Sequence, residues 1–124
     1  MKGKERDIPL ANKLRSEFIS RFKSNKEALS ELIISIGDRV LDKLVYRFKE
    51  EEQLDLLKEY ETLMKVATNV KESKLQEVYN LVEEVDDART WINDNGKFTS
   101  LVYEALYTVF REEAELQYEV AVAN

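Results

Sequence analysis

The sequence contains no cysteine and no histidine, and it has only one proline and three glycines. Without cysteine there are no disulfides and no thiolate chemistry, a composition that suits a reducing compartment. Without histidine, the usual zinc sites, the Ser-His-Asp triad and the commonest general base are excluded. The chain also lacks an apolar run of about 18 residues and a charged-then-apolar leader. We therefore expect neither a membrane span nor secretion, and we expect the cytoplasm as the location.

Length and charge distribution define the broad class of protein. A chain of 124 residues fits one domain and can bury roughly two thirds of its unfolded surface without covalent staples. Residues 1–26 carry eight Lys or Arg and three acids, whereas residues 27–124 carry eleven Lys or Arg and twenty-two acids. We expect one acidic domain, residues 1–124, in which residues 1–7 form a flexible basic arm.

The strongest apolar pattern lies in residues 28–48. Apolar side chains recur there at steps of three and four, the spacing that places them on one face of a helix. Ile34, Leu41 and Tyr46 widen this face, so we expect a central helix that neighbours cover on more than one side. The regularly spaced positions are Leu29, Leu32, Ile33, Ile36, Val40, Leu44, Val45 and Phe48.

Local signals predict where the first two helices begin and end. Pro9 suits the first turn of a helix, because it has no N–H to leave unsatisfied. Ser24 and Glu27 match a capping box, which predicts that the central helix starts near Asn25. The apolar spacing is lost at residues 49–53, so we expect the central helix to end there.

The C-terminal half gives less distinct boundaries. The apolar spacing runs almost continuously through residues 54–92, which can form one helix or two, and Asn69 with Glu72 is the only start signal between them. The Asn-Asp-Asn-Gly sequence of residues 93–96 predicts a stop, followed by a last helix over residues 98–120. The expected fold is all-α, a single-domain up-and-down bundle of four or five helices.

Paired carboxylates are the one constellation that can carry metal chemistry. Glu83 with Asp86, and Glu52 with Asp55, are each three residues apart and so share a helical face. Two such pairs on facing helices can hold Mg²⁺ and the phosphates of a nucleotide. The arrangement resembles the motif of the all-α MazG-like nucleotide pyrophosphatases, an E-x-x-E pair followed on another helix by E-x-x-D, although the first pair here is E-x-x-D with different flanks. The resemblance implies Mg²⁺-dependent nucleotide hydrolysis, whereas solvated acids on a Glu-rich helix account for the same residues without a metal or cofactor.

Basic residues of the first helix offer a second candidate surface. Lys13, Arg15, Arg21 and Lys23 can contact phosphate or an acidic partner. The rest of the chain is acidic and repels nucleic acid at long range, and no helix-turn-helix or RNA-binding signature is present. A solvated face, or an arm that pairs with an acidic face of a partner or of a second copy, fits these residues better than nucleic acid does.

The last predicted helix has a tyrosine-rich face beside its apolar stripe. Tyr103, Tyr107 and Tyr118 lie along this face, with Arg111 between them. Tyr and Arg are enriched at protein interfaces, so the face is a candidate docking surface. The alternative is that these tyrosines are half-buried against the first helix.

These features favour a non-enzymatic, acidic helical module that binds another protein, or itself, through its last helix. Small chains without catalytic motifs are common among subunits, adaptors and inhibitors, including those carried by viruses and mobile elements, an argument from analogy alone. Mg²⁺-dependent nucleotide hydrolysis and nucleic-acid binding by the basic N-terminal segment are the alternatives.

Overall fold

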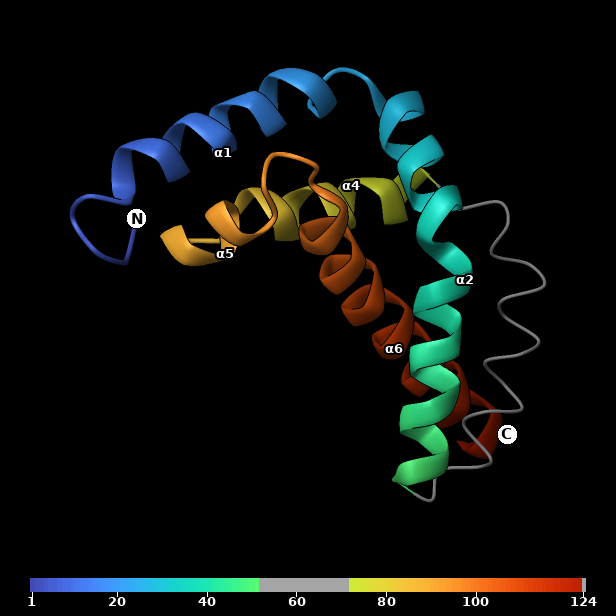
Figure 1. The fold of residues 1–124 in the computed structure, drawn as a ribbon. Coiled ribbons are helices and arrows are strands. Elements are labelled where there is room, and N and C mark those ends of the chain that lie inside the picture. Colours follow the sequence, from blue (N-terminus) through green and yellow to red (C-terminus); the bar gives the residue numbers. More distant parts are fainter. Residues whose placement is uncertain (52–71, 124) are drawn as a thin grey trace.

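The computed structural model describes residues 1–51 and 72–123, and this part of the chain folds as a small all-α bundle, which confirms the expected class. In Figure 1, α2 and α6 lie side by side and run in the same direction, and α1 passes over α4 and α5. The helix expected over residues 54–70 lies outside the described residues. The described helices are α1 (Ile8–Phe22), α2 (Lys26–Glu50), α4 (Glu72–Glu83), α5 (Ala88–Asn93) and α6 (Thr99–Ala123).

The boundaries of the first two helices follow the sequence closely. Pro9 stands in the first turn of α1, as expected, and α2 ends at Glu50. The cap of α2 differs from the predicted capping box, because the side chain of Asn25, not Ser24, accepts the hydrogen bond from the backbone N–H of Ala28 at 3.1 Å. Asn25 directly precedes the first helical residue, so its side-chain oxygen reaches the third N–H, one of the donors that have no partner inside the helix.

Residues 75–92 do not form one helix. The continuous helix predicted from their apolar spacing is therefore wrong, because the structure divides this range between α4 and α5. Helix α4 ends at Glu83, and α5 begins at Ala88 after a short loop. Asp87 caps α5, because its carboxylate accepts hydrogen bonds from the backbone N–H and the hydroxyl of Thr90, at 3.1 and 2.7 Å. These bonds to the ionised form lower the pKa of Asp87.

Hydrogen bonds from distant parts of the chain explain this break. Backbone carbonyls at and after the end of α4 accept donors from α1, from α5 and from the N-terminal segment, which are partners that a continuing helix would not offer them. The three donor–acceptor pairs are Arg15 Nε with the Glu83 carbonyl at 2.8 Å, Trp91 Nε1 with the Val85 carbonyl at 2.9 Å, and the Lys2 amide with the Asp86 carbonyl at 2.7 Å.

The N-terminal segment, expected as a flexible arm over residues 1–7, is held against this loop at its start. The amide of Lys2 donates to Asp86, and the amide of Ala88 donates to the carbonyl of Lys2 at 2.8 Å, so the two segments form a parallel bridge. The terminal ammonium of Met1 lies 3.4 Å from the carboxylate of Asp86. Backbone pairing therefore fixes the first residues, although the Lys2 side chain is exposed.

An aromatic cluster forms the core where α1, α4, α5 and α6 meet. Phe18 lies at its centre, and each of its four aromatic neighbours has its ring centroid between 5.0 and 5.9 Å from that of Phe18. Rings at these separations gain attraction beyond the burial of their surface. The neighbours are Phe22, Tyr79, Trp91 and Phe98.

The central helix is less enclosed than the sequence predicts. Ile34 and Tyr46 were expected to be covered, but 67% of Ile34 and 64% of Tyr46 are exposed. The regularly spaced positions of α2 do face the core, and Leu29, Val40 and Leu44 are buried. The apolar spacing therefore predicts the buried face of α2 correctly, but this face is narrower than the sequence indicates.

Candidate functional site

Tyrosine and lysine side chains join α2 to α6 along one edge of their contact. The hydroxyl of Tyr103 donates to the backbone carbonyl of Arg39 at 3.3 Å. The ammonium of Lys43 lies 5.2 Å from the ring centroid of Tyr103 and 4.7 Å from that of Tyr107, within the range of cation–π attraction. The same ammonium lies 3.2 Å from the carboxylate of Glu104. Lys43 is therefore held by two aromatic faces and one acid.

Arg111 clamps the next turn of the two helices together. Its guanidinium forms a bidentate pair with the carboxylate of Glu51, including a contact of 3.3 Å from Nη1 to Oε1. Nη1 also donates to the hydroxyl of Tyr107 at 3.0 Å, and Nε donates to Glu115 at 3.2 Å. The guanidinium carbon lies 5.5 Å from the ring centroid of Phe48. A planar guanidinium group held by this many partners has little rotamer freedom left to lose when another protein binds.

The Arg111 clamp shifts the protonation equilibria of both partners toward the charged pair. Hydrogen bonding to Arg111 lowers the pKa of Glu51, and hydrogen bonding to Glu51, with further bonds to Tyr107 and Glu115, raises the pKa of Arg111. Both side chains are partly open to solvent, so the pair orders the surface more than it stabilises the fold.

We expect Glu51→Gln to lower the melting temperature at neutral pH and to have less effect in acid. The folded protein holds the pKa of Glu51 below its ordinary value of 4.5, so the charged pair stabilises the fold above that pH, and this contribution is lost as the pH falls through the folded pKa. Melting curves from neutral pH to about pH 3 should show the gap between wild type and Glu51→Gln closing below about pH 4.5.

The matched control for this pH series is Glu112→Gln. Glu112 is an exposed carboxylate of α6 that forms no ion pair with any described residue. Its melting temperature should follow wild type across the series. A Glu51→Gln gap that is equally large at neutral pH and in acid would contradict the charged clamp.

An exposed tyrosine extends this surface on α2. Tyr46 follows Lys43 by three residues, so the two side chains are neighbours on the helix surface. We name the surface formed by Lys43, Tyr46, Tyr103, Tyr107 and Arg111 the tyrosine seam. The sequence does not indicate Tyr46 as a surface residue, because an aromatic side chain beside an apolar stripe is typical of the core.

The residues predicted as a docking face are placed together in part. Tyr103, Tyr107 and Arg111 share one face of α6 and are half-buried, as their spacing indicates. They lie against α2, not against the first helix as the alternative interpretation expected. Tyr118 falls within α6, but its side chain lies outside the described residues.

The basic residues of α1 do not form a single stripe. Arg15 is half-buried and donates to the Glu83 carbonyl at the end of α4, so it has a structural partner. Lys13, Arg21 and Lys23 are exposed, and the guanidinium of Arg21 lies 5.0 Å from the ring centroid of Phe22. Phosphate binding by this helix stays a prediction that the structure does not test.

The structure separates the carboxylate pair proposed for a metal. Glu83 is the last residue of α4, whereas Asp86 lies in the loop after it and contacts the N-terminal ammonium, so the two do not share a helical face. Glu52 and Asp55 lie outside the described residues. Within residues 1–51 and 72–123, no group of three or more acids, cysteines or histidines is arranged to hold a metal ion.

Comparisons with known proteins do not assign a family to this chain. Searches against protein-family models, curated proteins and solved structures give no match. Among the described helices, none combines the length and the apolar composition that crossing a membrane requires. We therefore infer function from the chain's own surfaces.

Proposed function

We propose that this chain is a non-enzymatic helical module that binds another protein, or a second copy of itself, through the tyrosine seam. The observation that carries this proposal is the exposure of Tyr46, 64% open to solvent, beside side chains that are already fixed in place. Tyr and Arg supply large contact areas with polar tips and dominate the binding energy of many interfaces. The absence of cysteine suits a role in the reducing cytoplasm.

The fixed geometry of the seam supports binding. Long side chains lose rotamer freedom when a partner covers them, which costs about 0.5–1.5 kcal/mol for each side chain. In this fold Tyr103 is bonded to Arg39, Lys43 lies over two rings, and Arg111 is clamped to Glu51. These side chains already lose much of their rotamer freedom when the chain folds. A partner that covers them therefore gains contact area with a smaller further loss of entropy.

We expect Tyr46→Ser to weaken partner binding by about 30-fold or more, the loss typical of a central interface residue. The partner is first captured from native cell extract with the tagged wild-type protein, and its Kd is then measured by calorimetry with purified components. Sedimentation velocity of the protein alone measures self-association with the same variants. Tyr46 is a cleaner probe than Tyr103 or Tyr107, because those two also join α2 to α6.

Leu10→Ser is the matched control for this experiment. Leu10 is a large apolar residue of α1, 48% exposed, and it lies outside the tyrosine seam. Its substitution removes a similar exposed side chain, and the Kd should stay within about twofold of wild type. Equal Kd values for Tyr46→Ser and Leu10→Ser, or the absence of both a captured protein and self-association, would exclude the seam as the docking surface.

A further inference from the structure

Polar side chains form an exposed stripe along α2 that includes Tyr46. Four residues of the stripe follow one another at steps of four, three and four positions, so their side chains lie on one face of the helix. All four are exposed, and 64% of Tyr46 is open to solvent. We name this face the α2 stripe, and its residues are Ser35, Arg39, Asp42 and Tyr46.

The two charged residues of the α2 stripe have opposite signs. Arg39 and Asp42 form no ion pair with any described residue. Their neighbour Lys43 is already held, since its ammonium lies 3.2 Å from the carboxylate of Glu104. A guanidinium and a carboxylate can join through two parallel hydrogen bonds. The α2 stripe therefore offers a partner one cation and one anion, three residues apart.

The α2 stripe is complementary to a second copy of itself. When two copies of a helix lie antiparallel about a two-fold axis, each contact occurs twice. With this axis between residues 40 and 41, Arg39 of each copy faces Asp42 of the other. The same axis places Tyr46 opposite Ser35, because both pairs have the same midpoint in the sequence.

The contact between Tyr46 and Ser35 also satisfies both hydroxyl groups. The hydroxyl of Ser35 donates to the backbone carbonyl of Leu32 at 2.7 Å, so its oxygen can still accept a hydrogen bond. A tyrosine hydroxyl usually finds a hydrogen-bond partner once its ring is covered. In the antiparallel pair, the Tyr46 hydroxyl donates to Ser35 of the second copy.

Charge disfavours two other arrangements of the same helix pair. In a parallel pair, Arg39 would face Arg39 and Asp42 would face Asp42, and like charges across an interface cost free energy. In an antiparallel pair with its axis at residue 44, Arg39 would face Lys49, which is again a like charge. The axis between residues 40 and 41 brings opposite charges together.

We propose that two copies of this chain associate through the α2 stripe as an antiparallel dimer, with Arg39 paired to Asp42 of the second copy. This inference rests on the proposed function and names a second copy as the protein that covers Tyr46. The contact is one pair of helices, so it belongs with the small interfaces, which bury less than about 1,200 Å² and form weak complexes. We therefore expect a Kd in the micromolar range.

Sedimentation velocity of the purified wild-type chain, from low micromolar to near-millimolar concentration, measures this association. The sedimentation coefficient should rise with concentration and level off at the value of a dimer. Raising the NaCl concentration should weaken the association, because salt screens exposed charges. A wild-type chain that stays monomeric over the whole range would overturn the dimer.

Two charge reversals test the pairing of Arg39 with Asp42. Arg39→Glu and Asp42→Arg should each stay monomeric alone, because each variant places like charges opposite one another. An equimolar mixture of the two variants should associate, since every acid of one then faces a cation of the other. The double variant, which exchanges the two charges, should associate with a Kd within about threefold of wild type. A mixture that stays monomeric would overturn this pairing.

Lys13→Glu is the matched control for net charge. It makes the same change in charge as Arg39→Glu, at an exposed position of α1. Its association should match that of wild type, and the circular dichroism spectra and melting temperatures of all variants should show that they stay folded. Equal loss of association in Lys13→Glu and Arg39→Glu would mean that net charge, and not the α2 stripe, controls association.

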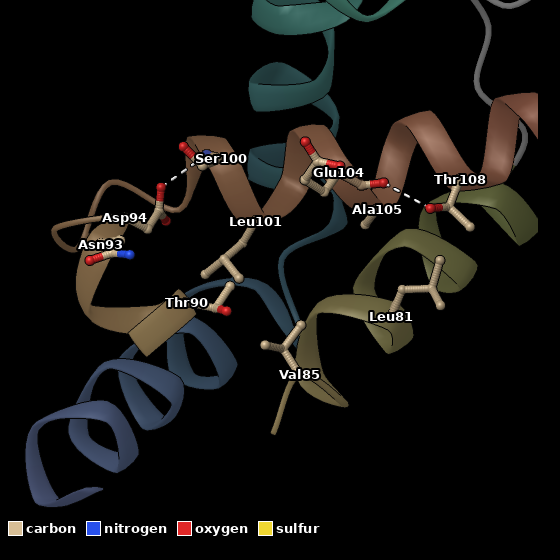
Figure 2. Close-up of a pocket in the computed structure, with 10 residues that line it drawn as sticks. All are labelled: Leu81, Val85, Thr90, Asn93, Asp94, Ser100, Leu101, Glu104, Ala105 and Thr108. Atoms are coloured by element: carbon tan, nitrogen blue, oxygen red, sulfur yellow. Dashed lines mark hydrogen bonds between the residues drawn. The ribbon is translucent and has the colours of Figure 1, made fainter. Parts of the chain in front are cut away.

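A second control concerns a different concave surface. A cavity of about 400 Å³ with mainly apolar walls lies between α4, α5 and α6 (Figure 2). Thr108 of α6 is exposed and lines it, so Thr108→Lys brings a charged side chain to this surface. The variant should associate as wild type does. Loss of association in Thr108→Lys, with association retained in Arg39→Glu, would place the interface at the cavity and overturn the proposal.

The proposed function and this inference can fail separately. A monomeric wild-type chain whose captured partner binds less tightly to Tyr46→Ser would keep the tyrosine seam as a docking surface and overturn the dimer. Association that is lost in both single variants and restored in their mixture would support the dimer, whether or not another protein is captured.

Discussion

Replacing Phe18 with alanine is expected to lower the free energy of unfolding by about 3–5 kcal/mol. Phe18 is fully buried, and its ring contacts four aromatic neighbours, which come from α1, α4, α5 and the residue directly before α6. Removing the ring loses its transfer free energy and leaves a cavity among neighbours that cannot all move inward. Urea denaturation followed by circular dichroism measures this loss.

Two control variants show whether the loss in Phe18→Ala comes from the buried aromatic ring. Phe18→Leu keeps most of the volume and should cost about 1–2 kcal/mol, since near-isosteric apolar substitutions are tolerated better. Leu10→Ala, at an exposed position of the same helix, should stay within about 0.5 kcal/mol of wild type. A loss at Phe18→Ala no larger than that of Leu10→Ala would mean that the aromatic cluster does not hold these helices together.

The helices could be predicted where local chemistry alone decides the outcome. Pro9, the Ser24–Glu27 pair and the sequence of residues 93–96 all act on their immediate neighbours, and the boundaries predicted from them are close to those observed, although Asn25 and not Ser24 forms the cap. Asn95 and Gly96 adopt positive φ values of 55° and 74°, the left-handed conformation that their residue types favour. Such effects extend over a few residues, so they can be read from the sequence.

The break between α4 and α5 could not be predicted in the same way. Val82, Val85 and Ala88 continue a spacing of three, and acidic residues between them are compatible with a helix. The break is stabilised by hydrogen bonds whose donors are distant in sequence, such as Arg15, 68 positions from Glu83. Only Asp87, with its side chain available to cap a new helix at Thr90, gave a local signal.

Only the α6 residues of the tyrosine seam could be predicted from the sequence. Tyr103, Tyr107 and Arg111 are four residues apart, so their common face follows from helix geometry. Their partners Arg39 and Glu51 are 60 or more positions away, and no local pattern pairs them.

Leu44 and Tyr46 are two residues apart in α2, and their side chains lie on opposite sides of the helix. Leu44 belongs to the core, whereas Tyr46 belongs to the proposed docking surface. Leu44 is fully buried, whereas Tyr46 is 64% exposed, and a separation of two residues points side chains to different faces of a helix. The face that contributes to the core and the face that belongs to the tyrosine seam are therefore separable by substitution. This separation defines a pair of variants with opposite expected effects.

Leu44→Ala is expected to lower the free energy of unfolding by about 2–5 kcal/mol, because it opens a cavity in the core face of α2. Tyr46→Ser should change it by no more than about 0.5 kcal/mol, since its side chain is largely in solvent. Urea denaturation of both variants, beside partner titrations at a temperature where Leu44→Ala stays folded, measures the two effects on one helix.

Binding should show the reverse order. Leu44→Ala leaves the seam side chains intact, so the Kd for the captured partner should stay within about threefold of wild type, whereas Tyr46→Ser should weaken binding by about 30-fold or more. Leu44→Met, which nearly conserves volume, replaces the alanine variant if that variant is too unstable to titrate. If Tyr46→Ser instead destabilises the fold as much as Leu44→Ala does, then Tyr46 is a structural residue and the seam does not bind through it.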